Sequence, residues 1–195
     1  MTRLPPLLVA AALLVAAQPA MAAGDRPPVT PTRDVDVVYM MVQPDRPGGP
    51  RVVEQRMRWA AGSQLLRLDP PTPGMWVVVD MRAHRLSAVR EADRSVLQMP
   101  ADQARFSPGA PPGAVTFQRQ GQAEIAGLSC TEWRTADVTG APTLACITAD
   151  GVLLRAAAAG RVVVEALRVT YAAQPESVFR IPPDYRKLTP PPGQR

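Results

Sequence analysis

Histidine and aromatic residues are scarce in this chain of 195 residues. His84 is the one histidine, and the two cysteines can pair with each other, so a zinc site would need carboxylates converging from elsewhere. We therefore expect no metal site. Tryptophan, tyrosine and phenylalanine together make up 5% of the chain, and the arginines are interspersed with acidic residues instead of forming a basic stripe. Nucleic-acid binding, which needs such a stripe with stacking aromatics, is not expected.

Catalytic and phosphate-binding motifs are also missing. Ser129 lies in Gly127-Leu128-Ser129-Cys130 and not in the G-x-S-x-G turn of hydrolases. No base is identifiable as its partner, and a serine without a base is inert. No glycine-rich nucleotide loop is present. We expect a protein that is not an enzyme and that needs no cofactor.

Long apolar runs are absent except near the N-terminus. Residues 1–22 read MTRLPPLLVAAALLVAAQPAMA, in which Arg3 precedes an apolar run and Ala20-Met21-Ala22 supplies the small residues of a cleavage site. The run is roughly half of the ~20 residues that a membrane span requires. The sequence predicts a signal peptide over 1–22, cleaved near Ala22, and a soluble periplasmic protein without a transmembrane segment.

Proline, in contrast, is abundant, with 23 residues. The prolines fall in clusters between long proline-free stretches rich in apolar residues, which excludes a disordered Pro-rich chain. We predict a flexible Pro-rich leader over 23–33, a single β domain over 34–188 and a flexible Pro-rich tail over 189–195.

The apolar segments of this domain are short and often alternate with polar residues, as in β-strands. Residues 153–160 (LLRAAAAG) suit a helix by composition but continue into a β-branched run, so we interpret them as strand. The pattern predicts about eleven strands with little helix, in an antiparallel meander that forms a sandwich, a barrel or a strongly curved sheet. The strand candidates are 35–42, 53–59, 65–68, 75–81, 86–90, 96–99, 115–119, 122–126, 129–135, 143–148, 152–158 and 162–171.

Two cysteines in an exported chain favour one disulfide, with two buried free thiols as the alternative. If their segments form a hairpin centred on Val138, Cys130 lies directly opposite Cys146, with a loop over 136–140. Opposed residues on antiparallel strands are within disulfide reach. A loop of this size gives a stabilisation of about 3 kcal/mol in the chain-entropy model.

Several segments resemble a known family. They are DMRAHRLSAVREADRSVLQMP, GQAEIAGLSCTEWRTADVTGAPTLACITADGVLL and PESVFRIPPDYRKL. In this order they resemble the periplasmic domain-of-unknown-function proteins related to outer-membrane lipoprotein carriers (LolA-like and LolB-like). The resemblance implies a half-open barrel of about eleven antiparallel strands. Its concave face would hold acyl chains or an apolar peptide.

Apolar residues on neighbouring strands of the first half are the candidate ligand contacts, because methionine adapts to irregular apolar partners. The alternative is that the same side chains fill a closed core. We predict a monomer that binds a lipid, a lipidated peptide or another apolar ligand, or alternatively an envelope interaction protein that docks a protein partner. The candidate residues are Met57, Trp59, Leu66, Trp76, Met81, Leu97 and Met99.

Overall fold

The computed structural model describes residues 26–46, 49–101, 116–136 and 140–188. The predicted signal peptide and the predicted C-terminal tail lie outside these residues. The described chain forms twelve strands and one short 3-10 helix: β1 (Val35–Arg46), β2 (Gly49–Ala60), β3 (Leu65–Asp69), β4 (Met75–Asp80), β5 (Arg85–Arg90), β6 (Ser95–Pro100), β7 (Gln118–Ile125), β8 (Leu128–Ala136), β9 (Pro142–Ile147), β10 (Leu153–Ala158), β11 (Arg161–Thr170), η1 (Glu176–Phe179) and β12 (Arg186–Leu188).

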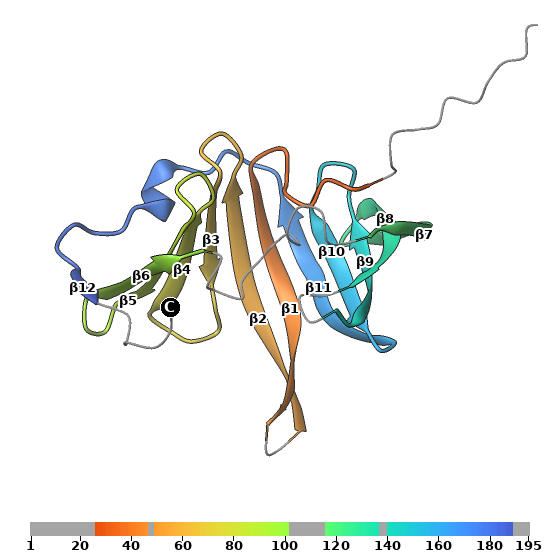
Figure 1. Ribbon diagram of the computed structural model, residues 1–195, viewed down its shortest axis with the longest axis horizontal. Helices are drawn as coiled ribbons and strands as arrows, with labels where there is room; N and C mark the ends of the chain where they lie inside the picture. The colour runs from red at the N-terminus through yellow and green to blue at the C-terminus, as the bar shows by residue number, and fades with distance from the viewer. Residues whose placement is uncertain (1–25, 47–48, 102–115, 137–139, 189–195) are drawn as a thin grey trace, which may run out of the picture.

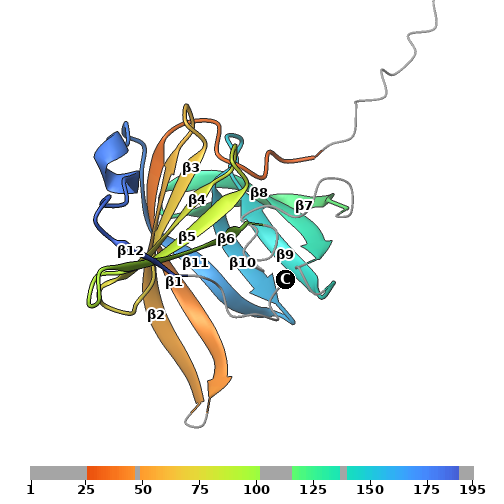
Figure 2. The ribbon, with the colours of Figure 1, turned by 60° about the vertical axis from the view of Figure 1, so that its left-hand side comes forward.

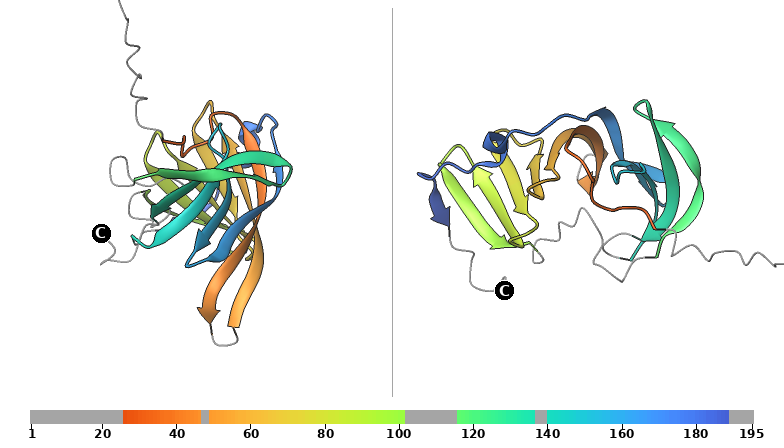
Figure 3. Two further views of the ribbon diagram at one scale, coloured as in Figure 1. Left: turned by 90° about the vertical axis from the view of Figure 1, so that its right-hand side faces the viewer. Right: turned by 90° about the horizontal axis from the view of Figure 1, so that it is seen from above.

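All twelve strands belong to one curved sheet, in the order β12-β6-β5-β4-β3-β2-β1-β11-β10-β9-β8-β7 (Figure 1). The sheet consists of two meanders, β1 to β6 and β7 to β11, that are joined where β1 pairs with β11. Seen from above, the sheet bends into an arch whose two edges do not pair with each other (Figure 3). The half-open, mainly β architecture expected from the sequence is therefore confirmed.

The strands differ from the predicted ones at three places. β1 and β2 are longer than the predicted strands 35–42 and 53–59, since they extend to Arg46 and begin at Gly49. The candidates 115–119 and 122–126 belong to a single strand, β7, with a register shift between Arg119 and Gly121. The short β12 was not predicted, and it pairs with β6 in parallel, whereas the other strand pairs are antiparallel. Eleven antiparallel strands and one short parallel strand thus make up the sheet, and residues 153–158 are strand as interpreted.

The main core lies on the concave side of the sheet. One buried cluster joins Trp59 and Leu66 of the first meander to Cys130 and Leu154 of the second. Side chains from both halves of an arched sheet can meet only on its inner side. These residues therefore lie on the concave face. Leu66, Leu154 and Val35 are among the largest fully buried side chains of the described residues.

Residues 26–33, which the sequence predicts as a flexible leader, are held against one end of the sheet. The backbone N–H of Thr32 donates to the carbonyl oxygen of Asp150 at 2.9 Å, and the Arg33 guanidinium pairs with the Asp150 carboxylate at 2.8 Å. The Trp59 indole N–H donates to the carbonyl oxygen of Pro31 at 2.8 Å. Gly151 has a φ of 91°, and a Cβ there would lie 2.5 Å from the Thr30 oxygen. The segment therefore closes this end of the arch.

The disulfide predicted between Cys130 and Cys146 is present, with the two Cα atoms 5.5 Å apart. The predicted register is wrong, because Glu132 and not Cys130 lies opposite Cys146. The innermost pair is Ala136 with Pro142. The hairpin is centred one residue later than predicted, so the bridge links residues that are diagonal in the ladder.

A C-terminal strap, residues 172–188, crosses the convex side of β3 to β6 (Figure 2). The strap contains η1 and ends in β12. Its side chains Ile181 and Tyr185 pack against a second cluster formed by Trp76, Val78, Val89 and Val96. The convex face of this half of the sheet is thus covered by the chain itself.

Candidate functional site

Two rows of apolar side chains cross the concave face of the first meander. Each row follows directly opposed residues from β1 to β6, so each side chain contacts the next across the ladder. The first row consists of Val35, Trp59, Leu66, Val79, Leu86 and Met99. The second row consists of Val37, Met57, Leu68, Val77, Ala88 and Leu97.

The two rows differ in exposure. The first row lies toward the closed end, and its first five members are between 0% and 6% exposed. In the second row Met57, Val77, Ala88 and Leu97 are half-buried. Met99, at the β6 end of the first row, is half-buried as well. The concave face therefore changes from a filled core at the closed end to an accessible apolar surface away from it.

Of the seven predicted contact residues, the structure brings six to the concave face. Met57, Trp59, Leu66, Leu97 and Met99 belong to the two rows, and Met81 packs against the same core cluster. Trp59 and Leu66 are 4% and 2% exposed, so they belong to the packed core next to the accessible residues. Their role in binding stays a prediction.

Trp76 lies on the opposite face. It belongs to the convex cluster under the strap, and its indole N–H donates to the Glu91 carboxylate at 2.6 Å. The Arg67 guanidinium stacks on its ring at 4.1 Å. Strand alternation is the reason, because residues of even number in β4 point away from Val77 and Val79. Trp76 is therefore a structural residue of the strap interface.

Sequence reasoning missed half of the accessible row. Val77 and Ala88 lie between Met57 and Leu97 in the register and share their exposure. The alternation in β4 was a usable signal, because it places Val77 on the face opposite to Trp76 and on the same face as Val79. Selection by residue size favoured the tryptophan over the valine.

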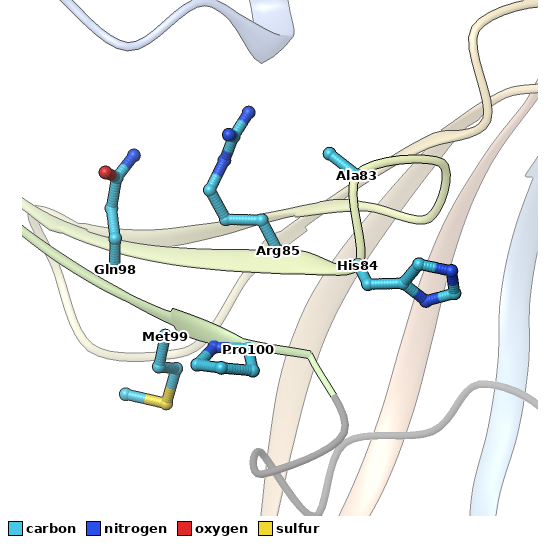
Figure 4. A pocket seen from close by; sticks show the side chains of 6 residues that line it. All are labelled: Ala83, His84, Arg85, Gln98, Met99 and Pro100. Carbon is cyan, nitrogen blue, oxygen red and sulfur yellow. The ribbon is translucent and has the colours of Figure 1, made fainter.

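A shallow hollow of about 320 Å³ lies at the edge of the sheet, where β5 begins and β6 ends. Figure 4 shows its lining residues: Met99 extends to one side of the strands, and Arg85 and Gln98 extend to the other. His84 is exposed in the turn before β5, with a φ of 49°. The hollow thus connects the concave face at Met99 with the polar side chains of the convex face.

The concave rows contain no charged residue, and the polar hydroxyl of Tyr39 in the same core cluster is already hydrogen-bonded. The Tyr39 hydroxyl donates to the carbonyl oxygen of Leu153 at 2.8 Å, and burial raises the pKa of this phenol. At the closed end, burial raises the pKa of Asp150, but hydrogen bonds from Thr148, Arg33 and Tyr171 outweigh it and leave the pKa low. The site therefore offers dispersion contacts and apolar burial and no titrating group at pH 7.

Among the described residues, no cluster of three or more potential metal ligands occurs, and no helix is long and apolar enough to cross a membrane. Neither finding assigns a function. The chemistry that the described residues offer at the concave face is the binding of apolar groups.

Comparisons with known proteins give similarity at the level of the fold. No protein-family model matches the chain, and no curated protein matches it. An uncharacterised conserved protein from Thermus thermophilus has a TM-score of 0.57 at 12% identity, covering 82% of this chain and 91% of that chain. MucB has a TM-score of 0.52 at 12% identity, covering 81% of this chain and 60% of that chain.

MucB has also been solved in complex with MucA(peri). A LolA superfamily protein from Nitrosomonas europaea matches with a TM-score of 0.41 at 10% identity, over 77% of this chain and 91% of that chain. The half-open β fold is therefore shared with the Thermus thermophilus protein and with MucB, and at these identities the likeness is one of fold alone.

Proposed function

We propose that this protein is an exported, non-catalytic binding module that holds a lipid, a lipidated peptide or another apolar ligand on its concave face. The accessible second row carries the proposal. Four of its six side chains are half-buried, whereas five of the six side chains in the neighbouring row are buried. An acyl chain lying along this row would complete the burial of the four side chains.

The energetics favour such a ligand. Each methylene removed from water contributes about 0.8 kcal/mol before the entropy of association is subtracted. Met57 and Leu97 can adapt to a flexible chain, and methionine in particular tolerates partners of different shape. Binding of this kind would be tolerant of chain length and insensitive to salt.

Export to the periplasm is part of the proposal. Its support is the disulfide between Cys130 and Cys146, which is typical of oxidising compartments, together with the signal-peptide pattern at 1–22. The absence of a recognisable nucleophile and base in the sequence supports a role without catalysis.

The experiment is titration of delipidated protein with a fluorescent fatty-acid probe. We expect saturable binding. The variants Met57→Gln and Leu97→Gln should each weaken it about three- to fivefold, because each loses on the order of 1 kcal/mol of apolar contact. The control is Val52→Gln, a residue 62% exposed in the protruding part of β2, which should leave binding unchanged.

Two results would contradict this function. One is the absence of saturable probe binding by wild-type protein whose circular dichroism is that of a folded β protein. The other is an equal loss of binding in Met57→Gln, Leu97→Gln and the Val52→Gln control, since the probe would then bind without regard to the concave face.

The second candidate is docking of a protein partner on the same face. MucB, which shares the fold, has been solved with a protein partner, and an apolar segment of a polypeptide would suit the accessible row as well as an acyl chain. Mass spectrometry of protein purified from its native periplasm separates the two. A stoichiometric polypeptide without extractable lipid would favour docking.

A further inference from the structure

A second hollow lies on the convex side between the strap and the sheet, and it shares Arg85 and Gln98 with the shallow hollow at the sheet edge. Its volume is about 270 Å³. Phe179 and Ile181 of the strap form one wall, and strands β3 to β6 form the other. The sheet residues that line it are Leu65, Val78, Asp80, Arg85, Ser87 and Gln98. We call it the strap hollow.

The sheet wall of the strap hollow consists of two cross-strand rows. Val78, Ser87 and Gln98 are directly opposed across β4, β5 and β6. Asp80 pairs with Leu65 on one side and with Arg85 on the other. Six residues of the wall thus hold fixed positions in the ladder, as a preformed site requires.

The centre of this wall is polar and buried. Ser87 is 3% exposed, and its hydroxyl accepts a hydrogen bond from the Gln98 amide nitrogen at 3.3 Å. A serine hydroxyl can donate as well as accept, so its O–H proton remains able to donate to a ligand. The Gln98 amide has a second N–H and a carbonyl oxygen for the same purpose.

A cation stands at the rim. Arg85 pairs with Asp80 at 3.4 Å, and this contact uses one of the five N–H donors of the guanidinium. The Arg85 side chain is 51% exposed. Asp80 is already engaged, because its second oxygen accepts the backbone N–H of Ala83 at 2.9 Å. The rim therefore offers guanidinium donors to an anion, beside a carboxylate whose two oxygens each accept one hydrogen bond.

The adjoining part of the convex face is filled in a different way. There Trp76, Val89 and Val96 pack directly against Ile181 and Tyr185. Over Ser87 and Gln98 the strap instead leaves space, with Phe179 buried at 5% exposure beside it. The strap thus packs directly on the apolar cluster around Trp76, and it covers a partly polar hollow over Ser87 and Gln98.

From this arrangement we propose that the strap hollow binds a small amphiphilic monocarboxylate. The carboxylate is held by Arg85 and by the Ser87 and Gln98 donors, and a short apolar chain lies against Leu65 and Phe179. The volume is just below the usual range for ligand sites, which limits the ligand to a small molecule. For a ligand of this size we expect a dissociation constant on the order of 1 mM.

The test titrates the full mature chain with hexanoate as the probe and with hexan-1-ol as its uncharged counterpart. Binding is monitored in ¹H–¹⁵N spectra. Hexanoate should shift the backbone amide of Ser87 and the side-chain amide of Gln98, saturating at about 20 mM. Shifts at Met57 and Leu97 would report the concave face, so the two sites are distinguished in one titration.

Three variants complete the design. Arg85→Gln should weaken hexanoate about fivefold or more at the strap hollow and leave hexan-1-ol nearly unchanged, since only the charge pair is lost. Ser87→Val removes the hydroxyl donor and should abolish the hexanoate shift of the Gln98 side-chain amide. Arg161→Gln, which removes an exposed arginine from β11 in the other meander, is the matched control and should bind as wild type.

The proposal is overturned if Ser87 and Gln98 do not shift in wild-type protein, or if Arg85→Gln binds hexanoate and hexan-1-ol as wild type does. A dispersed spectrum verifies that each variant is folded. If Ser87→Val does not fold, Gln98→Leu takes its place, with loss of the hexanoate shift at the Ser87 backbone amide expected.

Discussion

The two faces of strands β3 to β6 are built from alternate residues of the same short segments, yet they are covered differently. The convex face has its own cover, since the strap lays Ile181 and Tyr185 over Trp76. On the concave face Met57 and Leu97 are half-buried, without comparable closure by the described residues. Each face carries an apolar cluster, so the presence of apolar side chains alone does not separate the structural face from the binding face.

What separates them is the geometry of the partners. The strap is fixed by polar contacts around the convex cluster: Tyr185 and Trp76 both donate to Glu91, and Arg67 donates to the carbonyl oxygen of Val178 at 2.6 Å. Such contacts fix one arrangement. Methionine and leucine on the concave face accept many arrangements, as a ligand of variable shape requires.

The largest expected effect is at Trp76. Trp76→Ala should reduce the free energy of unfolding by about 3–5 kcal/mol, because it leaves a cavity under the strap and removes the partner of Glu91. Urea denaturation measures the change. Trp76→Phe keeps most of the ring and should lose less. A loss below about 1 kcal/mol in Trp76→Ala would mean that the strap does not stabilise the sheet.

A smaller effect is expected at Met57. Since its side chain is half-buried, Met57→Ala should cost about 1 kcal/mol of unfolding free energy, well below the cost at Trp76. The same denaturation experiment compares the two faces. A loss equal to that of Trp76→Ala would show that the concave face is packed as a closed core and would remove the distinction between the faces.

The smallest effect concerns pH. Hydrogen bonds from Tyr185 and Trp76 lower the pKa of Glu91 below its ordinary value of 4.5, so the stabilisation is present above pH 4.5 and is lost as the pH falls through the lowered pKa. The bond to Glu91 raises the pKa of Tyr185 above its ordinary value of 10.0, so this stabilisation is present below pH 10.0 and is lost as the pH rises through the raised pKa.

The variant Glu91→Gln tests this dependence. Its melting temperature should lie slightly below that of wild type between these limits, and the difference should vanish in acid. The effect is small because the pair is exposed and screened by water. A difference that stays constant from pH 3 to pH 7 would exclude the ionised carboxylate as its source.

Local patterns in the sequence predicted the strands well. Alternation located Val77 and Trp76 on opposite faces of one strand, and the Cys130–Cys146 pair indicated a hairpin. The predicted pairing was wrong by two residues, which moves the hairpin centre by one position and keeps every side chain on the same face of the sheet. A shift of this kind changes no composition and leaves little trace in a single sequence.

Long-range pairing was beyond such patterns. Arg186–Leu188 has three residues and no alternation to mark it as a strand, and its pairing with β6 depends on the path of the strap. The strap also determines the role of Trp76, because it packs on the face of β4 that carries this residue. A large aromatic residue on either face of a strand has the same local signature, and only the segment that packs on it assigns its role.

The pairing of β1 with β11 has a consequence for folding. It places Val37 beside Val169, near opposite ends of the described chain, in the middle of the sheet. Each meander can form from its own hairpins, but the two meanders can pair only after β11, the last long strand, has formed. Contacts so distant along the chain carry a high loop-closure cost and slow the search. We expect the seam between β1 and β11 to be the last part of the sheet to form.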